Sequence, residues 1–275
     1  NGRAMMRSAA ARIALLQASR EAFPEWIAGH GIDCHFVERG TDHVFRDARA
    51  LEAYLPELRA LAEVGVASEV IDGAEYERQE PAVLPGVAGT VRYPGDASLR
   101  PDRYAAGLAK ALQAAGGSLV EHCEVRGLED SAGGIRVATS TGEFHAGDVV
   151  MAVGAWSPKL ARALKLPHLA SVMQPGKGYS ITYDRPALAP QRPLTLQERS
   201  VCVSIWDWYG WRPMMVDDVP VIGAVPGRRG QWLATGHGML GVSMSVATAR
   251  LVADLVTGEP TAIDPAPYRL ERFGN

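Results

Sequence analysis

The sequence has few of the residues that mark disulfide-stabilised or metal-binding proteins. Its 275 residues contain three cysteines, Cys34, Cys123 and Cys202, which are widely spaced and odd in number. They make neither a disulfide framework nor a metal knuckle, so we expect reduced thiols and a cytoplasmic protein. The seven histidines show no His-x3-His spacing and the cysteines no Cys-x2-Cys spacing, and we therefore predict no metal site.

Long apolar runs and an excess of one charge are also missing. The run at 149–153 is far shorter than the ~20 apolar residues of a membrane span, so we expect no transmembrane segment. No signal peptide is recognisable. The 28 basic residues are interspersed with 31 acidic ones, and the net charge of −3 gives no reason to expect nucleic acid as a partner. A chain of this length and composition usually holds one or two domains.

The order of predicted elements indicates an α/β protein in which two kinds of structure interleave. Apolar residues at helical spacing predict helices at 5–27, 48–63, 76–81, 102–115, 157–164 and 242–256. Apolar and β-branched runs predict a hairpin of 34–37 with 41–45, strands at 89–94, 118–123 and 148–153, and a β-meander over 125–142. Further strands, antiparallel in character, are predicted at 178–183 and 200–205. Alternation of helices with the buried strand at 148–153 is typical of a doubly wound sheet.

Two glycine-containing turns follow apolar strands and precede helices. The first is Gly236-His237-Gly238-Met239-Leu240-Gly241, after the run at 231–235. Such a turn presents backbone N–H groups at a helix N-terminus, where an anion or an electron-rich ring is favoured, and its glycines let a flat ligand approach the main chain. Tight packing explains this turn alone equally well. The second, Gly154-Ala155-Trp156-Ser157, lies at a strand's carboxyl end, where ligands of open α/β sheets bind.

Three C-terminal segments form one pattern: Gly-Trp-Arg-Pro-Met at 210–214, Asp-Asp-Val-Pro-Val-Ile-Gly at 217–223, and the stretch 232–241. Together they resemble the signature of the FAD-dependent amino-acid oxidoreductases, the superfamily of D-amino-acid oxidase, glycine/sarcosine oxidase and D-amino-acid dehydrogenase. Supporting matches occur at 40–41, 80–82, 95–96, 154–157, 177–180 and 264–268. The resemblance covers nearly the whole chain in order. Within the superfamily, the sequence most resembles the small subunit of bacterial D-amino-acid dehydrogenase.

This resemblance implies an α+β architecture of two parts. An FAD/NAD(P)-binding doubly wound domain would comprise residues 1–30, 96–165 and 212–275, interleaved with an antiparallel-sheet substrate domain of residues 31–95 and 166–211. The family's first βαβ unit, with its Gly-x-Gly-x-x-Gly turn, has no match here, and several substrate-domain strands are missing between Asp207 and Trp208. Either these segments are truly absent or this sequence omits them. We favour omission, because losing internal strands would expose unpaired sheet edges.

The implied activity is FAD-dependent oxidation of the C–N bond of a D-amino acid or a related secondary amine. A hydride would pass to flavin N5, and the imino acid would hydrolyse to a 2-oxo acid. Electrons would then pass to a quinone or another carrier, which allows a peripheral position at the inner membrane. One alternative is an oxygen-using oxidase of the glycine or sarcosine type. Another, favoured by the missing glycine motif, is an inactive cofactor-free remnant or a binding protein.

The resemblance also assigns candidate site residues. Arg212 would hold the substrate carboxylate in a two-pronged contact, where the alternative is a surface arginine in a turn. Tyr179 would lie over the substrate pocket or be an ordinary strand tyrosine, and Trp208 and Trp211 would wall the pocket or pack in the core. For His237 we expect the backbone, not the side chain, to matter. The residues expected to contact FAD are Val125, Gly154, Ala155, Trp156, Gly236, His237, Gly238, Leu240 and Gly241.

Overall fold

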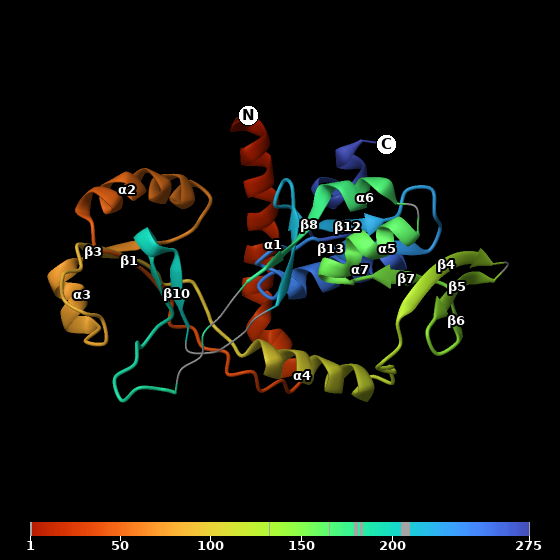
Figure 1. Cartoon of the computed structure of the whole chain (residues 1–275), viewed down its shortest axis with the longest axis horizontal. Helices are drawn as coiled ribbons and strands as arrows, with labels where there is room; N and C mark the ends of the chain where they lie inside the picture. The colour runs from red at the N-terminus through yellow and green to blue at the C-terminus, as the bar shows by residue number, and fades with distance from the viewer. Residues whose placement is uncertain are drawn as a thin grey trace. The chain divides into compact units, whose positions relative to one another are not determined.

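The chain folds into two compact units, each built from segments that are distant in sequence. The computed structural model describes residues 2–131, 133–164, 166–178, 181, 184–204 and 210–274 (Figure 1). The first unit contains residues 1–30, 112–179 and 209–275, and the second unit contains residues 31–111 and 180–208. The assignment of residues 1–30, 96–165 and 212–275 to cofactor binding, and of the remainder to substrate binding, stays a prediction.

The centre of the first unit is a sheet with helices on both faces. In the described residues its order is β12-β13-β7: β7 (Val149–Met151) runs parallel to β13 (Gln231–Thr235), and β12 (Val221–Ala224) pairs antiparallel with β13. Val221 of β12 packs with α5 (Ser157–Ala163) and α6 (Pro167–Val172), whereas its neighbour Ile222 packs with α1 (Gly2–Gly29) and α7 (Ser245–Thr257). This layering confirms the predicted α/β class.

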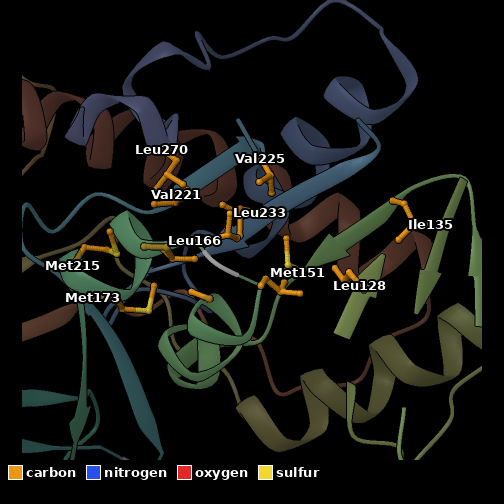
Figure 2. Close-up of a cluster of buried hydrophobic side chains, with 13 residues drawn as sticks. Leu128, Ile135, Met151, Leu166, Met173, Met215, Val221, Val225, Leu233 and Leu270 are labelled. Carbon is orange, nitrogen blue, oxygen red and sulfur yellow. The ribbon is translucent and has the colours of Figure 1, made fainter. Parts of the chain in front are cut away.

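The larger core of the first unit lies between the sheet and α5 and α6. In Figure 2, Met151 and Leu233 come from the sheet, while Leu166 comes from the turn before α6. The same core reaches an antiparallel meander of β4 (Val125–Ser131), β5 (Gly134–Thr139) and β6 (Glu143–Ala146) through Leu128 and Ile135. It also reaches an antiparallel ribbon of β8 (Met173–Lys177) and β11 (Trp211–Met215). Burial of one continuous apolar cluster thus fixes meander, sheet and ribbon together.

The second unit is a five-stranded sheet in the order β10-β9-β1-β3-β2. Its strands are β1 (Thr41–Phe45), β2 (Glu69–Asp72), β3 (Gly89–Tyr93), β9 (Leu194–Leu196) and β10 (Val201–Val203). All pairs are antiparallel except β1 with β9. Phe45 packs with residues of α2 (Ala48–Glu63), whereas Val44, which points to the opposite face, packs with Tyr76 of α3 (Gly73–Gln79).

The remaining elements of the described residues are one helix and four short 3-10 turns. Helix α4 (Pro101–Ala114) contains the boundary between the units at residues 111 and 112. The 3-10 turns are η1 (Gly154–Trp156), η2 (Gln197–Arg199), η3 (Ala266–Tyr268) and η4 (Leu270–Phe273).

Several predicted elements are confirmed with nearly the predicted bounds. Helix α2 spans 48–63 as expected; it begins after Asp47, whose side chain accepts a hydrogen bond of 2.9 Å from Arg49 N, and it ends just before Gly65, which has a φ of +82°. Helices α1 and α4, strands β1, β3 and β7 and the meander also lie where the sequence placed them.

Other predictions were wrong. The segment 34–37 is not a strand of a hairpin: Val37 forms one isolated bridge with Ser98, and β1 pairs with β3 and β9 instead. Helix α7 begins at Ser245 rather than at 242, because residues up to Met244 continue the turn. Strand β8 was not predicted, and the strand expected at 178–183 lies mostly outside the described residues, which omit 179, 180, 182 and 183.

The segment 118–123, predicted as a strand, forms no strand. Leu119 and Val120 are 52% and 53% exposed, and no strand of the described residues lies beside them to supply hydrogen-bond partners. Strand β7 is likewise an edge of its sheet within the described part of the chain, and Val150 is 40% exposed. An apolar pattern favours a strand, but a strand forms only where a neighbour pairs with it.

A buried ion pair stabilises the second unit. Asp42, on β1, is fully buried and accepts two hydrogen bonds from Arg92 on β3, of 2.7 Å from Nε and 3.0 Å from Nη2. The hydroxyl of Tyr76 donates a third bond of 3.2 Å to the same carboxylate. Burial and the Asp42 carboxylate raise the pKa of Tyr76, so this hydroxyl stays protonated and keeps donating.

We predict that Arg92→Ala destabilises the second unit by about 3–5 kcal/mol, because it leaves the Asp42 charge buried without its partner. The matched control is Arg78→Ala, which breaks the exposed Arg78–Glu75 pair and should change stability little. Urea unfolding followed by circular dichroism measures both. Equal midpoints for the two variants would contradict the role given to the buried pair.

Candidate functional site

The two glycine-containing turns lie side by side at one edge of the sheet of the first unit. They follow β7 and β13, which are parallel neighbours, so their carboxyl ends meet at the same edge. A buried hydrogen bond of 2.7 Å joins Ser157 Oγ to Thr235 Oγ1, and Thr235 Oγ1 also donates to the carbonyl of Gly154 at 3.3 Å. The hydroxyl at the end of one strand therefore fastens both turns together.

The turn after β13 follows a path that requires glycine. Gly236 and Gly238 have φ values of +84° and +57°, in the left-handed region, and a Cβ on Gly236 would meet the Met215 side chain at 2.7 Å. Within the described residues, the backbone N–H groups of Gly241, Val242 and Ser243 have no acceptor. These groups precede α7, whose N-terminal dipole adds a positive potential.

The turn after β7 is open on its outer side. Gly154 has a φ of +51°, and a Cβ built on it would meet nothing within 4 Å. The N–H groups of Gly154 and Ala155 have no acceptor among the described residues, whereas Trp156 N donates to Val153 O at 3.0 Å. The Trp156 side chain is 62% exposed, which is unusual for so large an aromatic residue. A flat group resting here would meet donors and an aromatic face.

The ribbon of β8 and β11 lies against the turn after β7 and is fastened to the turn after β13. Strands β8 and β11 both contact η1, and Gly238 N donates to Pro213 O at 3.1 Å. Arg212, on β11, is exposed, and its Nη1 donates to the Met239 sulfur at 3.3 Å. No carboxylate pairs with Arg212 among the described residues. Opposite Trp211 on the other strand, the Lys177 ammonium lies 5.7 Å from the indole centroid.

The side chain of His237 points away from this edge. Its Nε2 lies 3.0 Å from Thr248 Oγ1 on α7, and burial lowers the pKa of His237 to about 4. The imidazole is therefore neutral at physiological pH and hydrogen-bonded within the fold, and a role for the His237 backbone at the cofactor stays a prediction. Leu240 lies in the same turn, where its N–H donates to His237 O at 3.0 Å and its side chain packs against the core of α1 and α7.

Val125 lies at the start of β4, next to a β-bulge, and is 38% exposed. The neighbouring Glu124 pairs with Lys159 of α5 at 2.9 Å, which connects this strand end to the helix that follows the Gly154 turn. The structure thus brings all the predicted cofactor residues into the first unit.

Two expected pocket residues, Tyr179 and Trp208, lie outside the described residues. Sequence reasoning overlooked Met239, Gly178, Ser157 and Thr235. Their signal was present, because each lies inside or beside a segment already singled out. The partners of these residues, however, lie in distant segments of the chain and can be identified only from the three-dimensional structure.

The residues at this edge fit the ring of a flavin. Open N–H groups on two adjacent turns can donate to the electron-rich side of the ring, and the left-handed glycines let it reach the main chain. Gly236, Gly238 and Gly241 of the turn after β13 have Gly-x-Gly-x-x-Gly spacing, and the fit described here concerns the ring half of FAD.

No group of His, Cys, Asp and Glu residues in the described ranges could hold a metal ion. Among the helices that the structure describes, none has the length and apolar character needed to cross a membrane.

The sequence pattern of the family described as FAD dependent oxidoreductase (DAO) matches residues 2–205 and 188–255. The chain is 30% identical to a D-amino acid dehydrogenase of Rhizobium rhizogenes, over 94% of this chain and 74% of that protein. It is 32% identical to a D-amino acid dehydrogenase of Paramagnetospirillum magneticum, over 95% and 73%. These alignments extend over 310 and 317 positions, more than the 275 residues of this chain, so the relatives contain residues without a counterpart here.

Solved structures show the same fold. Glycine oxidase from Geobacillus kaustophilus superposes with a TM-score of 0.83 at 25% identity, over 94% of this chain and 82% of that one. L-proline dehydrogenase from P. horikoshii, at 17% identity, superposes with a TM-score of 0.76 over 94% and 82%. The fold class expected from the resemblance is confirmed.

We predict that Gly236→Ala destabilises the first unit by roughly 2–4 kcal/mol, because the new methyl group adds a clash with Met215 to the strain of a left-handed backbone. Gly258→Ala is the matched control: Gly258 ends α7 with a φ of +75° and has open space around it, so strain alone should cost roughly 1 kcal/mol. Denaturant midpoints measure the difference. Equal losses for both variants would show that the contact with Met215 does not constrain the turn.

A second prediction concerns acid stability. Unfolded His237 binds a proton near pH 6.5 but folded His237 only near pH 4, so the stability present above pH 6.5 is lost as the pH falls toward 4. His237→Gln keeps a polar partner for Thr248 and removes this proton uptake. Urea midpoints at pH 7 and pH 5 should therefore fall less for the variant than for the parent protein. An identical fall would assign the acid sensitivity to other groups.

Proposed function

The chain belongs to the family of FAD-dependent oxidoreductases, and from this premise we propose that it oxidises the C–N bond of a D-amino acid. The imino acid formed would hydrolyse to the 2-oxo acid. The substrate class is inferred from relatives named D-amino acid dehydrogenase at about 30% identity over most of the chain. The structural observation that carries the proposal is an exposed arginine, Arg212, on a ribbon fastened to two turns with open N–H groups.

FAD, when bound, supplies the hydride acceptor for the α-carbon of the substrate, and the protein supplies position and charge. Arg212 would bind the substrate carboxylate through two parallel N–H groups, which fixes the orientation of the α-carbon. The N–H groups of Gly154, Ala155, Gly241 and Val242 would face the flavin and stabilise negative charge on it. Trp156 would cover one side of the ring. No metal and no nucleophilic side chain is needed for this chemistry.

Two features of Arg212 favour a ligand over a structural role. Among the described residues no carboxylate compensates the charge of its guanidinium, and its hydrogen bond to Met239 goes to a neutral thioether. A structural arginine in this protein looks different: Arg92 and Arg272 both bind carboxylates in two-pronged contacts. Arg212 therefore retains the donors that a carboxylate ligand would use.

The electron acceptor and the location of the protein follow from the same inference. As a dehydrogenase it would pass electrons to a quinone or another carrier, from the cytoplasm or from a peripheral position at the inner membrane. An oxidase of the glycine type is the second candidate, favoured by the superposition with glycine oxidase. Hydrogen peroxide release during turnover would identify the oxidase, and reduction of a quinone without peroxide would identify the dehydrogenase.

One absorbance experiment tests the main proposal. The purified protein, supplied with FAD, should be yellow, and its flavin band should bleach without oxygen when D-alanine or D-proline is added. L-alanine is the control and should leave the band unchanged. A colourless protein that takes up no FAD would contradict the proposal and favour the cofactor-free remnant.

We predict that Arg212→Lys raises the KM for the D-amino acid by roughly tenfold or more, because a point charge replaces a two-pronged contact. The flavin band should persist, since the turns that face the ring are unchanged. Arg250→Lys, at an exposed position on α7, is the matched control and should leave KM unchanged. An unaltered KM in the Arg212 variant would remove this residue from the carboxylate site.

A further inference from the structure

Arg212 projects from one face of the ribbon of β8 and β11. On that face, the residue opposite Arg212 on β8 is a glycine. In the antiparallel register Arg212 faces Gly176 and Trp211 faces Lys177. Side chains alternate along a strand, so Arg212 and Met214 project from the same face as Gly176, while Trp211 and Lys177 project from the other. Gly178 follows Lys177, the last paired residue of β8. Like Gly176, it has no side chain, and it lies next to the Arg212 guanidinium.

Gly178 is in close contact with the Arg212 guanidinium. A Cβ on Gly178 would lie 2.9 Å from Nη2, 3.0 Å from Cζ and 3.3 Å from Nε. Gly178 does not have the left-handed φ that reserves a position for glycine. A side chain at 178 would therefore displace the guanidinium from its present position, although the backbone at 178 does not itself require glycine. The planar guanidinium rests against the bare main chain, which restricts its rotation.

Met239 holds the guanidinium from another side. Its sulfur accepts the hydrogen bond from Nη1 at 3.3 Å, although the side chain itself is 67% exposed. A thioether is a weak and neutral acceptor, so it orients one N–H without neutralising the cation. A carboxylate at this position would compete with a substrate carboxylate. The thioether leaves the charge and the remaining donors of the guanidinium available.

The contact with Met239 also connects the arginine to the turn proposed to face the flavin. Gly238 N donates to Pro213 O at 3.1 Å, which fixes the turn against the strand that carries Arg212. Met214 fills the space beside it: its side chain would lie 3.3 Å from a Cβ on Gly176 and 3.7 Å from one on Gly238. The position of the guanidinium is thereby set relative to Gly236–Gly241.

We propose that Gly178 and Met239 are positioning residues that hold the Arg212 guanidinium in the orientation required to bind the substrate carboxylate. This inference rests on the proposed function, since it assigns that carboxylate to Arg212. Gly178 leaves room for the guanidinium at its present position, and Met239 accepts a hydrogen bond from one of its N–H groups. Neither residue touches the reacting atoms.

The first test measures the freedom of Arg212 without substrate or cofactor. Phenylglyoxal modifies accessible arginines, and mass spectrometry of the full chain's peptides gives the rate at Arg212 relative to Arg250. Gly178→Ala should displace the flexible guanidinium and raise this ratio several-fold, and Met239→Leu should raise it less. Gly147→Ala, with open space around the new methyl group, and Met5→Leu, at an exposed position of α1, are the matched controls. Unchanged ratios in both test variants would overturn the inference.

The second test separates KM from kcat. Gly178→Ala should raise the KM for the D-amino acid on the order of 10- to 100-fold, as expected for a misplaced carboxylate contact, while flavin absorbance and thermal midpoint stay near those of the parent. Met239→Leu should raise KM several-fold, and Met239→Gln should restore it, because the amide oxygen again accepts from Nη1. Failure of the Gln variant to recover would show that Met239 acts only by packing and would overturn its assigned role.

The two tests distinguish failure of this inference from failure of the proposed function. If Arg212→Lys leaves KM unchanged while the labelling ratios rise, Arg212 does not bind the substrate carboxylate, and the proposed function of Arg212 fails together with this inference. If Arg212→Lys raises KM but the labelling ratios stay constant, the proposed function stands and the positioning by Gly178 and Met239 is rejected.

Discussion

The parallel pairing of β7 with β13 places two strand ends at one edge of a sheet, and the arrangement of the first unit depends on it. The hydrogen bond between Ser157 and Thr235 closes this edge, so the Gly154 and Gly236 turns become one surface with open N–H groups. Both faces of the sheet are covered by helices, while main-chain donors at the carboxyl ends of these strands have no acceptor within the described residues. The ribbon then adds a cation, Arg212, to this edge through the contact of Pro213 with Gly238.

The sheet of the second unit buries a charged side chain, and this charge must be compensated inside the protein. Asp42 is stabilised by Arg92 and Tyr76, which satisfy its oxygens from two other elements. Arg92 and Arg212 differ in how their charges are compensated. Arg92 pairs with a buried carboxylate and stabilises the fold, whereas Arg212 is exposed and hydrogen-bonded to a neutral thioether, so its charge remains available to a ligand.

The sequence predicted some of these features and missed others for identifiable reasons. The helix at 48–63 carries its own start signal in Asp47 and its apolar face at regular spacing, so local chemistry determined its bounds. The segment 118–123 has the same kind of apolar signal for a strand, yet it forms none, because a strand depends on a neighbour that local sequence does not report. Arg212 was found from a motif, but its contacts with Gly178 and Met239, 34 and 27 residues away, were not.

The sequence by itself determined most of the helices, several strands, the position of the glycine turn and the family, since each depends on local spacing or on a contiguous motif. Only the tertiary structure decided which strands are neighbours, which arginine is buried in an ion pair and which keeps its charge, and that His237 turns inward to Thr248. The physical reason is common to all three. Hydrogen bonds, burial and charge compensation between distant segments depend on how the chain folds back on itself, and no local pattern records that path.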